Sequence, residues 1–373
     1  MGVRVVEIGS IGPGPFTAML LADLGADVIR IDRPGPVSPM NTGPINLLHR
    51  GRPSVAVDLK TAEGCELVLK LCESADALIE GFRPGVMERL GVGPEQVLAR
   101  NPKLVFGRMT GYGQDGPMAM VAGHDINYIS IAGVLGSVTR EGERPLAPLN
   151  LVGDFGGGAM FLALGIVCAI LEARTSGQGQ VVDAAMVDGS AVLLSLFHGL
   201  RAGGLWSDSP GTNFLDSGAH FYEVYETADG GHVSVGALEP QFYAELLSIM
   251  EIDPADAPQW DQARWPDLKE RFAAVFLTRT RDQWAALLEP AEACATAIYG
   301  LTEAADHPHM VARGTFVEID GVRQPGPAPR FSRTPGAITG PPPPAGSDTD
   351  SGLAAWGIGD EERAALKAVG AIG

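Results

Sequence analysis

The stretch from Val3 to Asp32, VRVVEIGSIGPGPFTAMLLADLGADVIRID, decides the fold class. It begins with a β-branched, apolar run that predicts a strand, turns at Gly9 and Gly12, and continues as an amphipathic helix that ends near Gly25. The run DVIRID then predicts a second strand. A strand–helix–strand unit of this kind favours an α/β domain with a doubly wound, Rossmann-like parallel sheet.

The turn after the first strand, GSIGPGP, has the glycine content of a dinucleotide-binding loop but not its spacing. The glycines do not fall as G-x-G-x-x-G, and prolines occupy positions where backbone amides would have to face a phosphate. We therefore do not expect this turn to bind NAD.

Strand-like and helical runs continue to alternate up to about residue 202. The runs SVAVDLK, DALIEG, KLVFGRM and VVDAAMVD predict further strands, and apolar helices are expected over 156–174 and 188–202. From about Gly203 the chain becomes polar and glycine-rich, and then predicts a hairpin turning at 229–231 and helices over 241–251, 268–278 and 282–289. The expected organisation is a large domain over 1–205, a smaller α+β domain over 206–315, and a C-terminal segment over 316–373 that returns to the large domain and contains a short helix.

The composition argues against several classes of function. With 45 acidic and 27 basic side chains, the net charge of −18 disfavours nucleic acid and an anionic membrane surface as partners. The four cysteines form no C-x-x-C pair and MGVRVVEIG is no signal peptide, so we expect a cytoplasmic protein. The apolar run over 155–171 is short and lies between charged residues, which favours a buried core helix and no membrane insertion. The HPH at 307–309 lacks the ligand set of a metal site, so no metal is expected.

Two segments contain residues suited to proton transfer next to a carbonyl. AGHDINY, residues 122–128, places His124 beside Asp125, and PLNLVGDFGGG, residues 148–158, places Asp154 before three glycines. We expect both to lie in loops, and the second loop to lead into a helix whose unpaired N-terminal amides stabilise a developing negative charge. Each residue also has an ordinary interpretation, His124 as a solvated loop residue and Asp154 as a helix N-cap. Asp125 is interpreted as structural.

Four segments resemble those of α-methylacyl-CoA racemases, a group within the family III CoA-transferase superfamily: GHDINY (123–128), PLNLVGDFGGG (148–158), GQGQVVDAAMVDGS (177–190) and GALEPQFY (236–243). The resemblance extends from the first strand to about Ser332. It implies interconversion of (2R)- and (2S)-2-methylacyl-CoA thioesters by 1,1-proton transfer through an enolate. It also implies that no cofactor is needed, because coenzyme A is part of the substrate, and that two chains form an interlocked homodimer.

The resemblance assigns the chemistry to three residues. His124 and Asp154 would be acid and base on opposite faces of the substrate, and Glu239 would bond the second ring nitrogen of His124 and set its tautomer. The ordinary pKa values of imidazole and aspartate, about 6.5 and 3.9, are too far apart for both directions to run equally well. We therefore predict that burial raises the pKa of Asp154. Glu239 has an alternative as a glutamate favoured at a helix start by the helix dipole.

Binding of the CoA moiety is expected from arginines near the ends of predicted strands, because residues after strand ends converge at the ligand crevice and arginine bonds phosphate bidentately. The resemblance adds further positions. The predicted CoA- and substrate-binding residues are Ile11, Arg33, Arg50, Arg52, Val57, Leu59, Lys60, Arg83, Arg89, Tyr128 and Gly156. Met160 and Met186 lie near the expected acyl site but are interpreted as core residues.

Two other functions remain open at this point. In a family III CoA-transferase, Asp154 would instead be a nucleophile that takes the acyl group as an anhydride and passes through a CoA thioester. A non-catalytic acyl-CoA-binding module would keep the arginines and need no proton carrier. His124 together with Glu239 favours the racemase, since a transferase has no obvious need for a second proton carrier on the opposite face.

Overall fold

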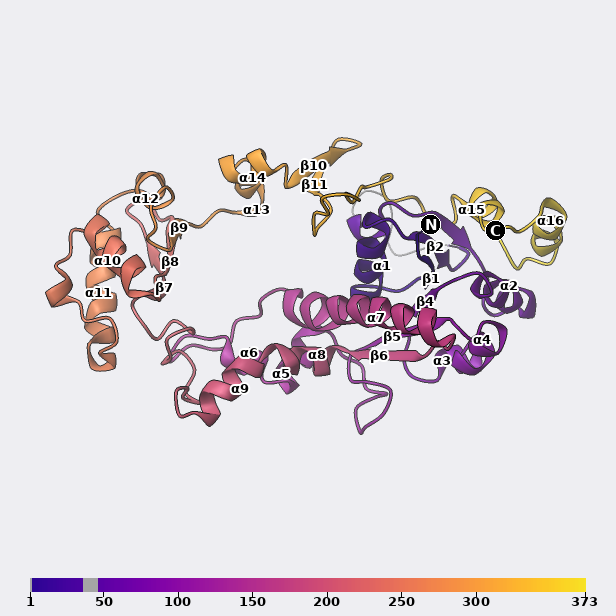
Figure 1. The fold of residues 1–373 in the computed structure, drawn as a ribbon, viewed down its shortest axis with the longest axis horizontal. Coiled ribbons are helices and arrows are strands. Elements are labelled where there is room, and N and C mark those ends of the chain that lie inside the picture. The colour runs from indigo at the N-terminus through magenta and orange to yellow at the C-terminus, as the bar shows by residue number, and fades with distance from the viewer. Residues whose placement is uncertain (1, 36–45) are drawn as a thin grey trace. The chain divides into compact units, whose positions relative to one another are not determined.

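The structure is a computed structural model that describes residues 2–35 and 46–373 (Figure 1). The chain forms two compact units. Unit 1 contains Met1–Ala132, Pro148–Leu193 and Ala312–Gly373, and unit 2 contains Gly133–Ala147 and Leu194–Val311. Residues 133–147 and 194–205, which the sequence placed in the large domain, therefore pack with the second unit.

A six-stranded parallel sheet forms the centre of unit 1, in the order β3-β2-β1-β4-β5-β6. The order reverses between β1 and β4, and doubly wound folds bind their ligands at such a switch point. The predicted Rossmann-like α/β class is therefore confirmed. The strands are β1 (Arg4–Ile8), β2 (Asp27–Asp32), β3 (Ser54–Ala56), β4 (Ala77–Glu80), β5 (Val105–Thr110) and β6 (Val181–Ala185).

Helices cover both faces of this sheet because successive side chains of a strand point to opposite sides. Val5 packs in a buried cluster with α1 and α7, whereas its neighbour Val6 packs in the cluster with α2 and α4. The helical elements of unit 1 up to β6 and directly after it are α1 (Pro13–Asp23), η3 (Leu47–His49), α2 (Ala62–Cys72), α3 (Val86–Arg89), α4 (Pro94–Arg100), α5 (Asp125–Ile131), η4 (Leu151–Ala159), α7 (Met160–Ser176) and α8 (Met186–Leu193).

Unit 2 is built on a three-stranded antiparallel sheet in the order β7-β8-β9. The predicted hairpin and the three predicted helices lie close to their expected positions, around a core that contains Phe221, Phe272 and Trp284. The elements are α6 (Val134–Ser137), α9 (Ser195–Ala202), β7 (Tyr222–Glu226), β8 (His232–Gly236), α10 (Pro240–Ile249), η5 (Pro254–Asp256), η6 (Gln262–Arg264), α11 (Trp265–Phe276), α12 (Arg281–Leu288), β9 (Ala295–Ala297) and α13 (Leu301–Ala304).

The C-terminal segment returns to the sheet of unit 1. Leu353 and Trp356 belong to the buried cluster that contains Val55 of β3, and Ile372 forms a bridge with Val57. The end of the chain therefore covers the outer strand of the sheet. Its elements are β10 (Phe316–Ile319), β11 (Val322–Pro325), α15 (Thr349–Ala355) and α16 (Asp360–Ala368), and it is preceded by α14 (Pro308–Arg313), which begins in unit 2 and ends in unit 1.

The predicted bounds of two helices were wrong. The helix expected over 188–202 is interrupted, since α8 ends at Leu193 and α9 begins at Ser195. The helix expected from residue 156 begins earlier, at Leu151, as the π-helix η4, and continues as α7. Asp154 therefore lies inside helical structure, because wide i→i+5 turns include the glycine-rich run that the sequence suggested was a loop.

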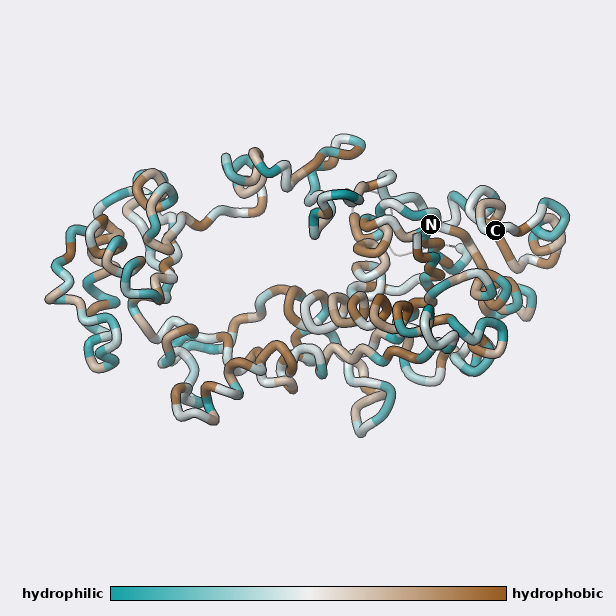
Figure 2. The backbone as a smooth tube through the Cα atoms, in the orientation of Figure 1, coloured by the Kyte–Doolittle hydropathy of each residue, from teal (hydrophilic) through white to brown (hydrophobic). Residues whose placement is uncertain are grey.

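The helix α7 is apolar along most of its length (Figure 2). One face, with Leu162 and Ile166, is buried in the cluster shared with the sheet. The other face is at least 48% exposed at Met160, Leu164, Val167 and Leu171. Among the described residues, the continuous helix Leu151–Ser176 has the length and apolar composition to cross a membrane, with 39% of its most apolar window buried. Core helices of soluble proteins share that composition, so the predicted core helix is correct for one face only.

Candidate active site

A cavity of about 680 Å³ lies in unit 1 at the carboxyl ends of β1, β4 and β5. Its walls include Gly12 from the turn after β1 and Gly81 from the turn after β4, so it opens at the reversal of strand order. A side chain on Gly81 would lie 3.0 Å from Ser10 Oγ, which shows how closely the two turns approach. We call this the switch-point cavity. Both His124 and Asp154 line it.

His124 lies immediately before α5, where the sequence predicted a loop position. Its side chain is exposed and lines the switch-point cavity. Its backbone N–H donates to Asn127 Oδ1 at 3.0 Å, and its carbonyl accepts from Asn127 N at 2.8 Å. The helix α5 therefore fixes the backbone of His124 and leaves the imidazole facing the cavity.

Asp154 lies in the first turns of η4, and its half-buried carboxylate lines the same cavity. Asp154 Oδ2 accepts a hydrogen bond from Asn150 Nδ2 at 3.0 Å. The backbone N–H of Asp154 donates to Asp125 Oδ2 at 2.7 Å. Because Asp125 is the first residue of α5, this bond ties the start of α5 to η4 and brings the two chemical segments together.

The helix N-terminus that the sequence placed after Asp154 lies before it. In a π-helix each N–H bonds the carbonyl five residues back, so the amides from Gly156 onward are used within η4. A side chain on Gly156 would meet Leu151 O at 3.2 Å, which places Gly156 inside the helix and not in a cavity wall. Gly156 does not line the switch-point cavity, and its predicted substrate contact stays a prediction. The unpaired amides of the helix belong to its first turn.

Burial is the main cause that raises the pKa of Asp154, and the charge of Asp125 raises this pKa further. The hydrogen bond from Asn150 and the nearby His124 act in the opposite direction. The net shift is upward, in the predicted direction. A carboxyl group with a raised pKa holds its proton to a higher pH and can both donate and accept in proton transfer.

A second cavity, of about 210 Å³, lies at the carboxyl ends of β1 and β2 and shares Phe82 with the first. Four predicted CoA-binding residues line it, namely Arg33, Val57, Leu59 and Lys60. Arg89 lines a shallow pocket beside it, together with Lys60. Ile11, Arg83 and Tyr128 line the switch-point cavity. The structure therefore places these predicted residues around three hollows that are joined by shared residues: Phe82 lines both larger cavities, and Lys60 lines both the second cavity and the shallow pocket.

Arg50 and Arg52 are placed differently from the prediction. Arg50 is 3% exposed and donates to Asp23 Oδ2 at 2.6 Å. Arg52 is 4% exposed and donates to Glu7 Oε2 at 2.5 Å. Both guanidinium groups already have buried carboxylate partners, which makes them part of the packing between β1, α1 and the segment before β3. The predicted role in phosphate binding is therefore wrong for these two arginines.

Of the two methionines near the expected acyl site, only Met186 is a core residue as predicted. Met186 is 6% exposed and forms part of the switch-point cavity wall, as a core residue beside the site. Met160 is 52% exposed on α7, so its interpretation as a core residue is wrong.

Glu239 lies in unit 2 at the residue before α10, and its side chain is exposed. It makes no side-chain hydrogen bond to the first turn of α10, so capping does not account for it. Its proposed contact with His124 stays a prediction.

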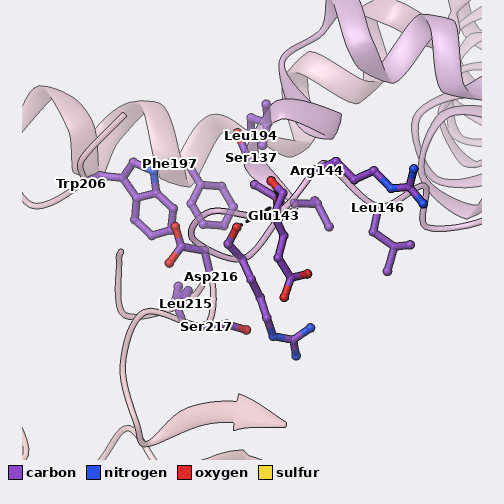
Figure 3. Close-up of a pocket in the computed structure, with 13 residues that line it drawn as sticks. Ser137, Glu143, Arg144, Leu146, Leu194, Phe197, Trp206, Leu215, Asp216 and Ser217 are labelled. Carbon is purple, nitrogen blue, oxygen red and sulfur yellow. Dashed lines mark hydrogen bonds between the residues drawn. The ribbon is translucent and has the colours of Figure 1, made fainter. Parts of the chain in front are cut away.

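Unit 2 has a cavity of its own, of about 280 Å³, lined by residues of 137–146 and 194–217 (Figure 3). Phe197 and Trp206 form part of its wall with their ring centroids 4.9 Å apart, and Arg140 is paired with Glu223. No histidine lines this cavity. It therefore lacks the imidazole that two-base proton transfer needs.

Sequence reasoning missed two residues of the site. The first is Asn150, which donates to the carboxylate of Asp154. The two residues are four apart, a spacing that places side chains on one helix face and could have indicated this contact. Tyr112 lines the switch-point cavity with its ring centroid 4.9 Å from that of Tyr128, and its position just after the β5 strand was a similar signal. No group of three or more His, Cys, Asp or Glu side chains suited to a metal occurs within 2–35 and 46–373.

Comparison with known proteins agrees with this geometry. The sequence model of CoA-transferase family III matches residues 1–349. The chain is 45% identical to the α-methylacyl-CoA racemase of Mus musculus over 97% of this chain and 94% of that protein, and 42% identical to the α-methylacyl-CoA racemase of Homo sapiens over 90% and 87%. It is also 33% identical to the succinyl-CoA–D-citramalate CoA-transferase of Chloroflexus aurantiacus over 91% and 90%.

A solved structure shares the whole fold. The crystal structure of Rv3272 from M. tuberculosis superposes with a TM-score of 0.78 at 27% sequence identity, over 93% of this chain and 97% of that chain. Sequence and fold agree over nearly the full length. The chain therefore belongs to CoA-transferase family III.

Proposed function

We propose that this chain is a racemase of 2-methylacyl-CoA thioesters that works by 1,1-proton transfer without a further cofactor. The observation that supports it most is that His124 and Asp154 line one cavity at the switch point of the sheet. An imidazole and a carboxyl group are the two proton carriers that such a reaction needs. The similarity to two α-methylacyl-CoA racemases, at 45% and 42% identity, points to the same chemistry.

The proton count closes for both directions. In one direction neutral His124 removes the α-proton while the protonated carboxyl group of Asp154 delivers a proton to the opposite face. In the other direction the Asp154 carboxylate removes the proton and the imidazolium of His124 delivers one. The enolate needs hydrogen-bond donors at its oxygen, commonly worth about 3 kcal/mol each in the transition state. We assign this task to the backbone amides of the first turn of η4 that precede Asp154, since the Asp154 N–H already donates to Asp125.

The second cavity fits the nucleotide end of the substrate. Arg33 and Lys60 supply positive charge there, Val57 and Leu59 supply apolar contacts, and Arg89 adds positive charge from the shallow pocket that shares Lys60. The thioester would then reach the switch-point cavity past Phe82, which lines both hollows. In the switch-point cavity the acyl chain would lie beside Met109 and Met186. Arg83, next to Phe82 in the chain, would lie near the phosphates.

A CoA-transferase is the second candidate, because Asp154 could act as a nucleophile and a relative at 33% identity is a succinyl-CoA–D-citramalate CoA-transferase. The two reactions differ in their need for an acceptor acid. A racemase exchanges the α-hydrogen of a 2-methylacyl-CoA with D₂O and inverts the centre in the absence of any free carboxylic acid. If label enters only after a free acid is added, the transferase is the correct function.

The residues are tested by substitution. We expect His124→Ala and Asp154→Asn each to lower racemisation by at least about 1000-fold, because each removes one of two essential proton carriers. Affinity for CoA, measured by calorimetry, should stay within about threefold of the wild-type value. A wild-type protein that binds CoA esters but shows no racemisation, and whose His124→Ala variant binds them equally well, would leave a simple acyl-CoA-binding module as the better function.

We also propose that the protein is a cytoplasmic homodimer of interlocked chains. The exposed apolar side chains of α7 support self-association, since monomeric proteins rarely expose contiguous apolar patches of large area. The four free cysteines are consistent with a reducing compartment. In such an assembly Glu239 would bond the imidazole of His124 and fix its tautomer.

A further inference from the structure

The peptide bond between Gly123 and His124 is held at both of its polar atoms. The N–H of His124 donates to Asn127 Oδ1 at 3.0 Å. The carbonyl of Gly123 accepts a hydrogen bond from the hydroxyl of Tyr128. Both partners belong to α5, the helix that His124 begins. The Asn127 and Tyr128 side chains, from one helical turn, therefore hold the N–H and the C=O of the same peptide group. We call this pair of hydrogen bonds the clamp.

The Tyr128 side of this clamp is itself rigid. Tyr128 is 7% exposed, and its ring lies edge to face with that of Tyr112, with an interplanar angle of 84°. A side chain on Gly111 would lie 2.1 Å from the Tyr128 ring, and one on Gly123 would lie 2.8 Å from it. The ring therefore packs directly on two glycine backbones, one just after β5 and one just before His124. This packing leaves the Tyr128 hydroxyl little freedom to move.

We propose that Tyr128 and Asn127 are positioning residues that hold His124 in the place where it exchanges a proton with the substrate. This inference rests on the proposed function, in which His124 is one of two proton carriers. Within residues 2–35 and 46–373 the imidazole of His124 makes no side-chain hydrogen bond that would fix it, so its position depends on its backbone. A displacement of about 1 Å at a reacting group can cost about 100-fold in rate.

Loss of this clamp should affect the two enantiomers of the substrate differently, because each gives its α-proton to a different base. The enantiomer whose α-proton goes to Asp154 still loses it, but the enolate then waits for a proton from a misplaced His124. During that delay Asp154 exchanges its proton with solvent and returns a deuteron to the same face. This enantiomer should therefore exchange its α-hydrogen faster than it racemises. For the other enantiomer, removal by His124 is the slow step, so exchange and racemisation fall together.

The test is Tyr128→Phe, which removes one hydroxyl and keeps the ring. We expect kcat to fall about 10-fold with KM for the acyl-CoA within twofold of wild type. In D₂O, followed by NMR with each enantiomer separately, the exchange-to-racemisation ratio should rise at least fivefold for one enantiomer and stay near the wild-type ratio for the other. Asn127→Ala, at an exposed position, should give the same asymmetry and serves if Tyr128→Phe does not fold.

The matched control is Tyr225→Phe in unit 2. The Tyr225 hydroxyl donates to the carbonyl of His220, also five residues earlier in the chain, at 2.6 Å. The control therefore loses the same kind of bond and should lower the unfolding temperature without altering the exchange-to-racemisation ratio of either enantiomer.

The proposal is overturned if Tyr128→Phe or Asn127→Ala folds and shows the wild-type ratio for both enantiomers, whether its rates are unchanged or equally reduced. That outcome would leave the proposed function intact. The proposed function fails separately if the wild-type protein does not exchange the α-hydrogen without an acceptor acid, or if His124→Ala remains fully active.

Discussion

At the scale of single residues, the site contains two proton carriers in different surroundings. The side chain of His124 is exposed, whereas that of Asp154 is half-buried next to Asp125. Asp125 contributes both a hydrogen bond to the backbone of Asp154 and a negative charge. This residue, interpreted as structural from sequence, therefore also influences the chemistry of the carboxyl group beside it.

The variant Asp125→Asn should move the pH dependence of the reaction. It keeps an oxygen that can accept from the Asp154 N–H but removes the charge that raises the pKa of Asp154. The pKa of Asp154 should therefore fall. For the enantiomer whose proton goes to Asp154, the acid limb of the kcat/KM profile against pH should move to lower pH. An acid limb that stays in place or moves to higher pH would contradict this account.

Among elements, the packing of η4 on α8 depends on two glycines. A side chain on Gly189 of α8 would lie 1.8 Å from Gly157 O, and one on Gly157 would lie 2.6 Å from Ser190 N. Because both clashes are with backbone atoms, no side-chain rotation can relieve them. The backbones of the two helices therefore pack in direct contact, and this contact helps to set the position of the turn that contains Asp154.

The variant Gly189→Ala should destabilise the protein by about 3 kcal/mol, at the upper end of overpacking costs. Gly199→Ala is the matched control, because Gly199 also lies in a helix but a side chain there would meet nothing within 4 Å. That variant should be neutral or more stable by up to about 1 kcal/mol, since alanine favours a helix. Thermal unfolding followed by circular dichroism compares them. Equal unfolding temperatures would mean that the η4–α8 contact can relax.

For the whole molecule, the exposed face of α7 is the feature that a single chain leaves unexplained. Its apolar residues recur at helical spacing and belong to the same helix that contributes Leu162 to the core. A helix with two apolar faces is expected where both faces are covered. The C-terminal segment covers the outer strand of the sheet with α15 and Ile372. The cover proposed for the exposed face of α7 is a second copy of the chain.

The variant Leu164→Glu should convert a dimer into monomers at micromolar concentration. A charge placed in an apolar contact should weaken association at least about 100-fold, which equals about 2.7 kcal/mol. Leu277→Glu is the control, because Leu277 in unit 2 is also exposed, at 51% compared with 62% for Leu164. Analytical ultracentrifugation gives the mass of each variant. A wild-type protein that is both monomeric and active would refute the proposed dimer.

Local patterns in the sequence were sufficient for much of the fold. The alternation of strand and helix signals from Val3 to Asp32 and onward predicted the parallel sheet, because periodicity and turn residues are local properties. The ends of those strands predicted where the ligand would bind, because all strands of a parallel sheet end at one edge. His124 and Asp154 were recognised by residue type together with family resemblance.

Only the tertiary structure decided which charges are free and how the site is braced. Arg50 and Arg52 have the same sequence signal as Arg33, but their partners Asp23 and Glu7 lie 27 and 45 residues away and are chosen by packing. The π-turns around Asp154 likewise pack against α1 and α8, which are distant in the chain. The sequence by itself determined the elements and the types of reactive side chain. Long-range contacts determined which of them are buried, paired or exposed to a substrate, because burial and ion pairing depend on neighbours that are distant in the chain.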